Sequence, residues 1–306
     1  MNNNQSKPNL RNIQGLLLLD KPIAMTSNTA LQIVKRLYMA KKAGHTGSLD
    51  PLASGMLPIC FGEATKFAQF LLDTDKWYQV TAKLGIKTTT GDAEGEVVAE
   101  KPIPNFTEKE IEKILEKFRG EIMQLPSMYS ALKHKGQPLY KLARAGVTIE
   151  REKRPVTIFE LNLLRKTDTE LEFNVHCSKG TYIRTLIEDI GDELDVGAHV
   201  TTLRRLRVGE YKEEQMVSLP TIENFASQQD FNKLNGFLLP IETMVIKWPL
   251  LQVTDQIAYY MRQGNSVIVP QAPSSGWVRL QLKNGIFIGV AEVLPDGKIA
   301  PRRLVN

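Results

Sequence analysis

Cysteine and histidine are scarce in this sequence of 306 residues. The two cysteines, Cys60 and Cys177, lie far apart, so we expect free thiols in place of a disulfide framework. A metal site built on histidine needs closely spaced ligands, and this spacing is missing among the four histidines His45, His134, His176 and His199. We therefore expect no structural metal, and no motif suggests a cofactor.

Long apolar runs are also missing. The longest aliphatic run, Leu16 to Leu19, is too short to span a bilayer. The first six residues are polar and do not read as a signal peptide. No repeat period or low-complexity tract is found, and we expect a soluble, cytoplasmic protein.

The excess of positive over negative charge is small. Lys and Arg number 39 against 34 Asp and Glu, which gives a net charge of +5 and a sequence pI near 9.0. A net positive charge favours a polyanionic partner. Because this excess is modest, the clustering of the basic residues is the more informative feature. The length suggests about two domains.

One cluster of basic residues lies between Tyr129 and Arg154. Its cations are interleaved with Tyr129 and Tyr140, and they are Lys133, His134, Lys135, Lys141, Arg144, Arg151, Lys153 and Arg154. Basic groups hold phosphates and aromatic rings stack on bases, a composition that suits looped RNA. Such a run also occurs on a merely solvated face, and the residues alone leave both interpretations open.

A carboxylate at Asp50 stands inside the stretch 44–55, which reads Gly-His-Thr-Gly-Ser-Leu-Asp-Pro-Leu-Ala-Ser-Gly. Pro51 keeps Asp50 out of the α region, and the flanking glycines permit positive φ and close approach of a ligand. This pattern predicts a reactive carboxylate at a rigid corner. The structural alternative is that Asp50 caps a helix with Pro51 at its first position.

Two alternating segments predict strands near this carboxylate. One begins at Tyr78, a residue type that is more often core than catalytic. The other ends at Cys177 and turns into a helix beginning near Thr181, where Arg184 is either a surface charge or the partner of a carboxylate. After this helix, residues 203–208 predict a short strand with a basic face.

The last 60 residues predict a small β-rich module. A short helix ending at Gly264 is followed by two strands that flank Asn284-Gly285, a strong hairpin signal. Before it, strands and helices mix without regular alternation, which favours an α+β fold. Residues 1–12 are polar and aperiodic, and we expect a mobile tail there.

Several long blocks, kept in order along residues 13–306, resemble the bacterial tRNA pseudouridine-55 synthase family, called TruB. They are residues 18–22, 44–55, 60–66, 75–78, 128–133, 177–185 and 203–206. The resemblance implies the pseudouridine-synthase fold, a mixed and largely antiparallel sheet with a central cleft. It also implies a catalytic domain over 13–245, with 129–154 as an RNA-gripping segment, and a PUA-like RNA-binding domain over 246–306.

The resemblance further implies roles for single residues. Asp50 would be the nucleophile and Arg184 its partner, holding the carboxylate ionised. Tyr78 would stack on the target uracil and take part in proton removal, while Tyr182 and the backbone at Leu203 enclose the base. Whether Asp50 attacks ribose or base stays open.

Substrate binding is implied for five more residues, His45, Lys21, Lys133, Lys135 and Arg144. The target would be uridine-55 in the T arm of tRNA, flipped out of the folded elbow at a cost of a few kcal/mol, and His45 would replace a lost stacking partner. We expect a monomer that needs no protein partner. A role as a tRNA folding chaperone is left open beside the isomerase.

Three other functions remain in competition. A hydrolase would pair Asp50 with an acid of the turn 88–96, namely Asp92, Glu94 or Glu96. A pure RNA-binding protein would grip the tRNA elbow and do no chemistry. A relative that depends on guide RNA and partner proteins would be inactive alone.

Overall fold

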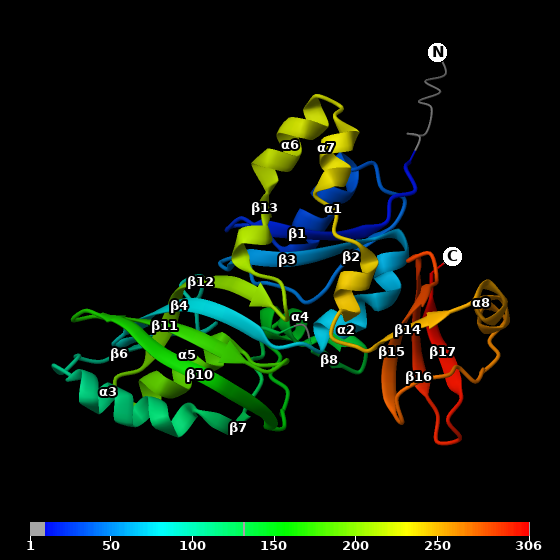
Figure 1. The fold of residues 1–306 in the computed structure, drawn as a ribbon. Helices are drawn as coiled ribbons and strands as arrows, with labels where there is room; N and C mark the ends of the chain where they lie inside the picture. The colour runs from blue at the N-terminus through cyan, green and yellow to red at the C-terminus, as the bar shows by residue number, and fades with distance from the viewer. Residues whose placement is uncertain (1–9, 131, 306) are drawn as a thin grey trace, which may run out of the picture.

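A nine-stranded mixed sheet forms the centre of the molecule in the computed structural model, which describes residues 10–130 and 132–305 (Figure 1). The strands follow the order β13-β1-β3-β12-β4-β11-β10-β7, and β2 pairs with β3. Their bounds are β1 Gly15–Lys21, β2 Ala43–His45, β3 Ser54–Phe61, β4 Lys76–Leu84, β7 Gly120–Gln124, β10 Arg154–Lys166, β11 Glu170–Cys177, β12 Ala198–Val208 and β13 Val217–Ser218. Among the strand pairs described for this sheet, only β1–β13 and β3–β12 are parallel, so the expected α+β fold with a largely antiparallel sheet is confirmed.

Helices cover both faces of this sheet. The larger core packs strand residues against helices α1, α3, α5, α6 and α7 (Ser27–Leu37, Glu108–Leu115, Ile183–Glu193, Leu219–Ser227 and Phe231–Gly236). The second core lies on the other side, against η1, α2 and η4 (Gly62–Phe67, Ala68–Leu72 and Ile241–Val245). In β1, Leu17 and Leu19 enter the first core while Leu16 and Leu18 enter the second, which explains the unbroken leucine run.

The C-terminal module has its own sheet, ordered β14-β15-β16-β17, and its own core. Its elements are β14 Leu250–Val253, α8 Asp255–Arg262, β15 Gly276–Leu282, β16 Phe287–Val293 and β17 Ile299–Leu304. The hairpin at Asn284-Gly285 is confirmed, with Gly285 at φ 85°. Strand β14 was not expected, because its four residues follow a proline and show little pattern.

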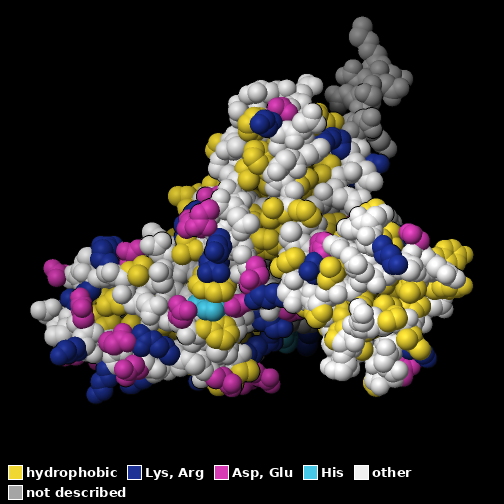
Figure 2. Space-filling view, in the orientation of Figure 1, with side chains coloured by type: hydrophobic (Ala, Val, Ile, Leu, Met, Phe, Trp, Pro, Cys, Tyr) yellow, Lys and Arg dark blue, Asp and Glu magenta, His cyan; other side chains and the backbone are white. Residues whose placement is uncertain are grey.

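The basic segment 129–154 folds as two short strands and one helix, β8 Lys133–His134, β9 Gln137–Pro138 and α4 Leu139–Arg144. In Figure 1 these elements lie behind the sheet. On the face drawn in Figure 2, positive and negative side chains are interspersed and no single basic patch stands out. Of the expected tail, residues 1–9 lie outside the described residues.

The expected basic face on residues 203–208 is wrong. These residues belong to a strand of 11 residues, β12, whose register shifts between Arg205 and Arg207. Arg204 is half-buried and pairs with Asp20 and Glu213, whereas Arg205 is only 2% exposed. Neighbouring strand residues point to opposite faces, so adjacent arginines could not share one face.

Candidate active site

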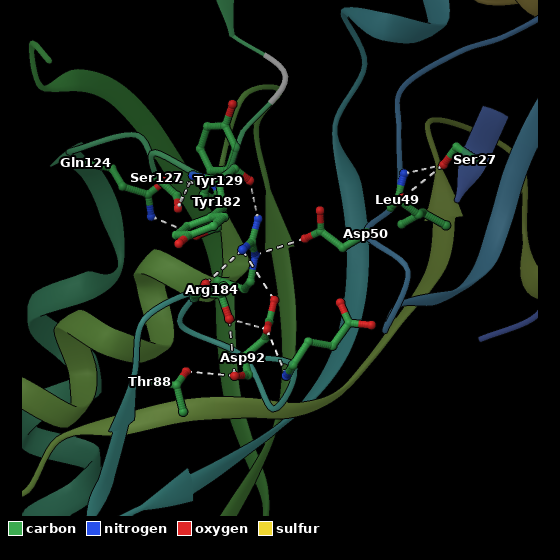
Figure 3. A network of polar contacts seen from close by, with 12 residues as sticks. Ser27, Leu49, Asp50, Thr88, Asp92, Gln124, Ser127, Tyr129, Tyr182 and Arg184 are labelled. Carbon is green, nitrogen blue, oxygen red and sulfur yellow. Dashed lines mark hydrogen bonds and ion pairs between the residues drawn. The ribbon is translucent and has the colours of Figure 1, made fainter. Parts of the chain in front are cut away.

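Asp50 lies in the loop between β2 and β3. The next element of the described chain after Pro51 is strand β3, so Pro51 does not begin a helix and the helix-cap interpretation is wrong. The loop is tied to the first turn of α1 by Ser27. The Ser27 hydroxyl accepts a hydrogen bond from the Leu49 backbone N–H at 2.7 Å and lies 3.0 Å from the Leu49 carbonyl (Figure 3). The Ala53 N–H donates to the Asp50 carbonyl at 3.1 Å, which closes a turn at the carboxylate.

Glycine at position 55 lets this loop lie against β12. Gly55 has φ +95°, and a Cβ there would lie 2.3 Å from the Arg205 carbonyl oxygen. No Cβ fits at that distance, so glycine at position 55 has a steric cause.

Arg184 reaches Asp50 from the first turn of α5. Its Nε lies 2.9 Å from Asp50 Oδ2, and its Nη1 lies 3.3 Å from Asp92 Oδ2 (Figure 3). The guanidinium also donates to the backbone carbonyls of Thr90 and Tyr129, each at 2.8 Å. The Arg184 side chain is 6% exposed, so four acceptors fix its orientation in a water-poor setting.

The sequence analysis named Asp92 only as an acid of a rival hydrolase and did not expect it beside Arg184. Asp92 is 3% exposed, and its Oδ1 accepts hydrogen bonds from Thr90 Oγ1 at 2.5 Å and from the Glu94 N–H at 3.1 Å. The sequence signal was a turn rich in Thr, Gly and Asp, in which flanking hydroxyls and amides satisfy a carboxylate. Only the approach of this turn to α5 brings Asp92 to Arg184.

The pKa of the Asp50 carboxyl is raised above its usual value, with burial as the largest cause. The charge and the hydrogen bond of Arg184 lower that pKa, as expected, while the nearby charge of Asp92 raises it. Arg184 therefore offsets part of the effect of burial.

A cavity of about 510 Å³ opens in front of Asp50. It is lined by six of the residues expected at the site, which come from four separate segments: His45, Asp50, Tyr78, Tyr182, Arg184 and Leu203. The Tyr182 backbone is held by Gln124, through hydrogen bonds of 2.8 and 3.0 Å. The volume suits one nucleotide-sized group.

The tyrosine and histidine of this cavity have shifted pKa values. Burial raises the pKa of Tyr78, and the charge of Arg205 opposes that shift. Burial also lowers the pKa of His45, and Arg205 lowers it further. His45 is therefore neutral at pH 7, which suits stacking on a base.

Four of the expected binding residues do not line this cavity. Lys21 is fully buried, and its ammonium donates to the carbonyls of Pro22 and Met25 at 2.7 and 2.6 Å. Burial lowers the Lys21 pKa to about 8. Lys133 and Lys135 are exposed, and Arg144 lines an adjoining cavity of about 600 Å³ that shares Asp50 and Arg184.

Arg205 also lines the cavity of Asp50, whereas the sequence analysis assigned it to the basic face of a short strand. Its Nε donates to the Met56 carbonyl at 2.7 Å, and its Nη2 donates to the Gly47 carbonyl at 3.3 Å. A buried arginine beside the predicted nucleophile is thus a second residue that sequence patterning missed.

Models of one protein family match almost the whole chain. Residues 35–183 match "TruB family pseudouridylate synthase (N terminal domain)". Residues 184–246 match "tRNA pseudouridylate synthase B C-terminal domain", and residues 249–305 match "Pseudouridine synthase II TruB, C-terminal".

Curated relatives named "tRNA pseudouridine synthase B" are similar over nearly their full length. The chain is 57% identical to that of Coxiella burnetii (strain Dugway 5J108-111), covering 97% of this chain and 96% of the relative. It is 54% identical to that of Ectopseudomonas mendocina (strain ymp), covering 96% of each.

Solved structures also resemble it. A chain from "Crystal Structure of a Cbf5-Nop10-Gar1 Complex" matches with a TM-score of 0.74 at 24% identity, covering 99% of this chain and 91% of that chain. That likeness concerns the fold. No helix in the described ranges is long and apolar enough to cross a membrane.

Proposed function

This chain belongs to the TruB family of pseudouridine synthases, and on that premise we propose that it isomerises uridine-55 in the T loop of tRNA to pseudouridine. Asp50 is the nucleophile, and the substrate follows from the names of the relatives. The observation that carries the proposal is the 2.9 Å contact between Asp50 and Arg184 at the wall of a nucleotide-sized cavity.

The reaction breaks the bond between N1 of uracil and C1′ of ribose and joins C1′ to carbon 5 of the same base. The proton on carbon 5 leaves and N1 gains one, so no oxidant and no added group are needed. Asp50 starts the isomerisation as a carboxylate, by attack on ribose or on the base. The charge and the hydrogen bond of Arg184 favour the ionised carboxyl of Asp50, against the effect of burial on its pKa.

The target nucleotide reaches the cavity by flipping out of the tRNA elbow. Unstacking a base costs a few kcal/mol, and the ring of neutral His45 offers a replacement surface. Tyr78, Tyr182 and Leu203 enclose the uracil in the cavity that they line. Lys133, Lys135 and Arg144 lie on the segment that also carries Tyr129 and contact phosphates at the mouth.

Two regions of the chain have different roles. Residues 13–245 carry the chemistry, and residues 246–306 form a PUA-like module that binds RNA. Lys21 acts behind the Asp50 loop, because its ammonium is buried and its charge favours the ionised carboxyl of Asp50. The enzyme works in the cytoplasm as a monomer without an obligatory protein partner and needs no metal. A folding activity on tRNA that survives loss of Asp50 would be a separate function.

One assay tests this proposal against its rivals. Purified protein is mixed with a T-arm hairpin transcript in excess chelator, and the modified position is mapped by chemical detection of pseudouridine. We expect conversion of the uridine at position 55 with no change in RNA mass. A released base would favour hydrolysis, and no conversion would favour a pure binding protein or a guide-dependent enzyme.

A further inference from the structure

Arg205 is a buried cation without a carboxylate partner. Of the described residues, no Asp or Glu forms an ion pair with it, although Arg184 and the adjacent Arg204 each contact two carboxylates. Its side chain is 2% exposed and is the largest among the fully buried ones. An unpaired buried charge is unfavourable. A negative charge that forms beside Arg205 during the reaction would therefore be stabilised by it.

The backbone places Arg205 directly opposite Tyr78. The two residues are paired on the antiparallel strands β12 and β4, so their side chains share one face of the sheet. Both side chains line the cavity of Asp50. The close approach of Gly55 to the Arg205 backbone and the bonds to Met56 and Gly47 leave the guanidinium little freedom.

The direction of the hydrogen bonds follows from chemistry. A guanidinium only donates, so the Tyr78 oxygen accepts where the two groups meet. Arg205 lowers the pKa of Tyr78 through its charge and through a hydrogen bond, against the larger effect of burial. A phenol that accepts from a cation is a stronger donor, and its own O–H remains available to a group in the cavity.

We propose that Arg205 is a positioning residue that polarises the Tyr78 hydroxyl, which then donates to a carbonyl oxygen of the uracil while the ring carries negative charge. This rests on the proposed isomerisation. When the N1–C1′ bond breaks, its electron pair stays on the ring and is delocalised onto the carbonyl oxygens. When the base is attacked instead, the ring becomes an enolate, so either route produces an anion.

This role differs from proton removal by Tyr78. A hydroxyl that donates to the ring is not a base for the proton on carbon 5, and a raised pKa keeps it protonated at pH 7. The pair acts like an oxyanion hole, in which fixed donors face the charge that develops.

The experiment measures single-turnover rates on the T-arm hairpin for Arg205→Gln, Tyr78→Phe and the double variant. Each substrate is prepared with hydrogen or deuterium on carbon 5 of the target uridine. We expect Tyr78→Phe to lower the rate by about 10²–10³, the loss that follows removal of one oxyanion-hole donor. Arg205→Gln should lower the rate of the parent but change the rate of Tyr78→Phe by less than about threefold.

The isotope separates the two roles of Tyr78. If the pair stabilises the ring anion, its loss slows a step before proton removal, and no primary isotope effect appears in any variant. A primary isotope effect in Tyr78→Phe would assign proton removal to Tyr78 and overturn the proposal. Additive losses in the double variant would also overturn it.

Two controls exclude a purely structural effect. Arg204→Gln makes the same charge change one residue away, on the opposite face, and should keep the rate within about threefold of the parent. Arg205→Lys keeps the charge and should recover part of the rate lost in Arg205→Gln. Equal losses in both Arg205 variants at unchanged melting temperature would contradict a role of charge. Absence of conversion by the parent would instead contradict the proposed function.

Discussion

Two buried arginines, Arg184 and Arg205, line the cavity, and they differ in whether a carboxylate neutralises their charge. Arg184 contacts the carboxylates of Asp50 and Asp92, so its positive charge is neutralised. Within the described residues, the hydrogen bonds of the Arg205 guanidinium go to the backbone carbonyls of Met56 and Gly47, and its charge lowers the pKa of Tyr78. Both guanidinium groups are more than nine-tenths buried.

The difference concerns when each charge is neutralised. Arg184 is neutralised before substrate arrives, so its contribution is to hold a nucleophile and tune its pKa. Arg205 has no counter-charge at rest, and its electrostatic attraction is available to a charge that forms during the reaction. Burial of an arginine alone therefore does not define its role, and the partners must be counted.

Arg184→Gln should cause the largest loss of activity. With the cation gone, the like charges of Asp50 and the buried Asp92 are no longer offset, and the pKa of Asp50 rises further. We expect single-turnover rate at pH 7 to fall by about 10³ or more, with RNA affinity retained. Arg184→Lys keeps the charge but not the forked geometry, and should fall between the two. A parent-like rate for Arg184→Gln would remove Arg184 from the mechanism.

Asp92→Asn should have a smaller and partly opposite effect. The like charge of Asp92 raises the pKa of Asp50, so its removal should shift the acid limb of the rate profile to lower pH. Arg184 loses one anchor, and we expect the maximum rate to fall by about tenfold, since small displacements at a site cost this much or more. The measurement is the pH dependence of single-turnover rate. An acid limb that moves to higher pH would contradict the network.

Changes in the basic segment 129–154 should affect the affinity for RNA and leave Arg184 with Asp50, and Arg205 with Tyr78, unchanged. Replacement of Lys133, Lys135 and Arg144 by alanine should lower the slope of log affinity against log salt by somewhat under one unit for each phosphate that is no longer neutralised. The chemical step at saturating RNA should barely change. A matched variant removes three cations elsewhere, at Lys109, Lys113 and Lys166. Equal slopes for the two triple variants would assign the segment to a solvated face.

The smallest effect concerns stability near Arg205. Burial lowers the pKa of Lys76 to about 8, and the charge of Arg205 lowers it too. The folded state then binds fewer protons than the unfolded state between pH 8 and the unperturbed value of 10.5. The free energy of unfolding should therefore rise with pH in that window, by at most about 1.4 kcal/mol per pH unit.

Lys76→Met should remove this rise. Denaturant titrations of parent and variant at several pH values between 8 and 10.5 measure it, and the difference between the two proteins cancels the tyrosines and thiols that titrate in the same range. Identical slopes would mean that Lys76 keeps an ordinary pKa in the folded protein.

Sequence patterns were sufficient where structure is local. The hairpin predicted at Asn284-Gly285 depends on a few neighbouring residues, and it is confirmed. The capping box that the structure shows at Thr107 and Glu110 is local in the same way. The helix start that carries Arg184 is also local, because a turn directly precedes it. The close pairing of Arg184 with Asp50 was expected from the family resemblance, and the structure contains that contact.

Long-range placement is what the patterns missed. Arg205 becomes buried because β12 lies between β3 and β4, and this order and the register shift cannot be deduced from alternation within one strand. Asp92 meets Arg184 only after its turn folds onto α5. Lys21 is the last residue of a buried strand, and its ammonium bonds to carbonyls of the loop that follows. This hides a residue type that is usually found at the surface.

Asp50→Asn tests the central claim most directly, because the change removes one charge and almost no volume. Single-turnover conversion of the T-arm hairpin and equilibrium affinity for the same RNA are measured side by side with the parent. The account predicts no detectable pseudouridine from the variant, with affinity kept within a few fold. Product formed at a near-parent rate by Asp50→Asn would contradict a nucleophilic carboxylate at this position.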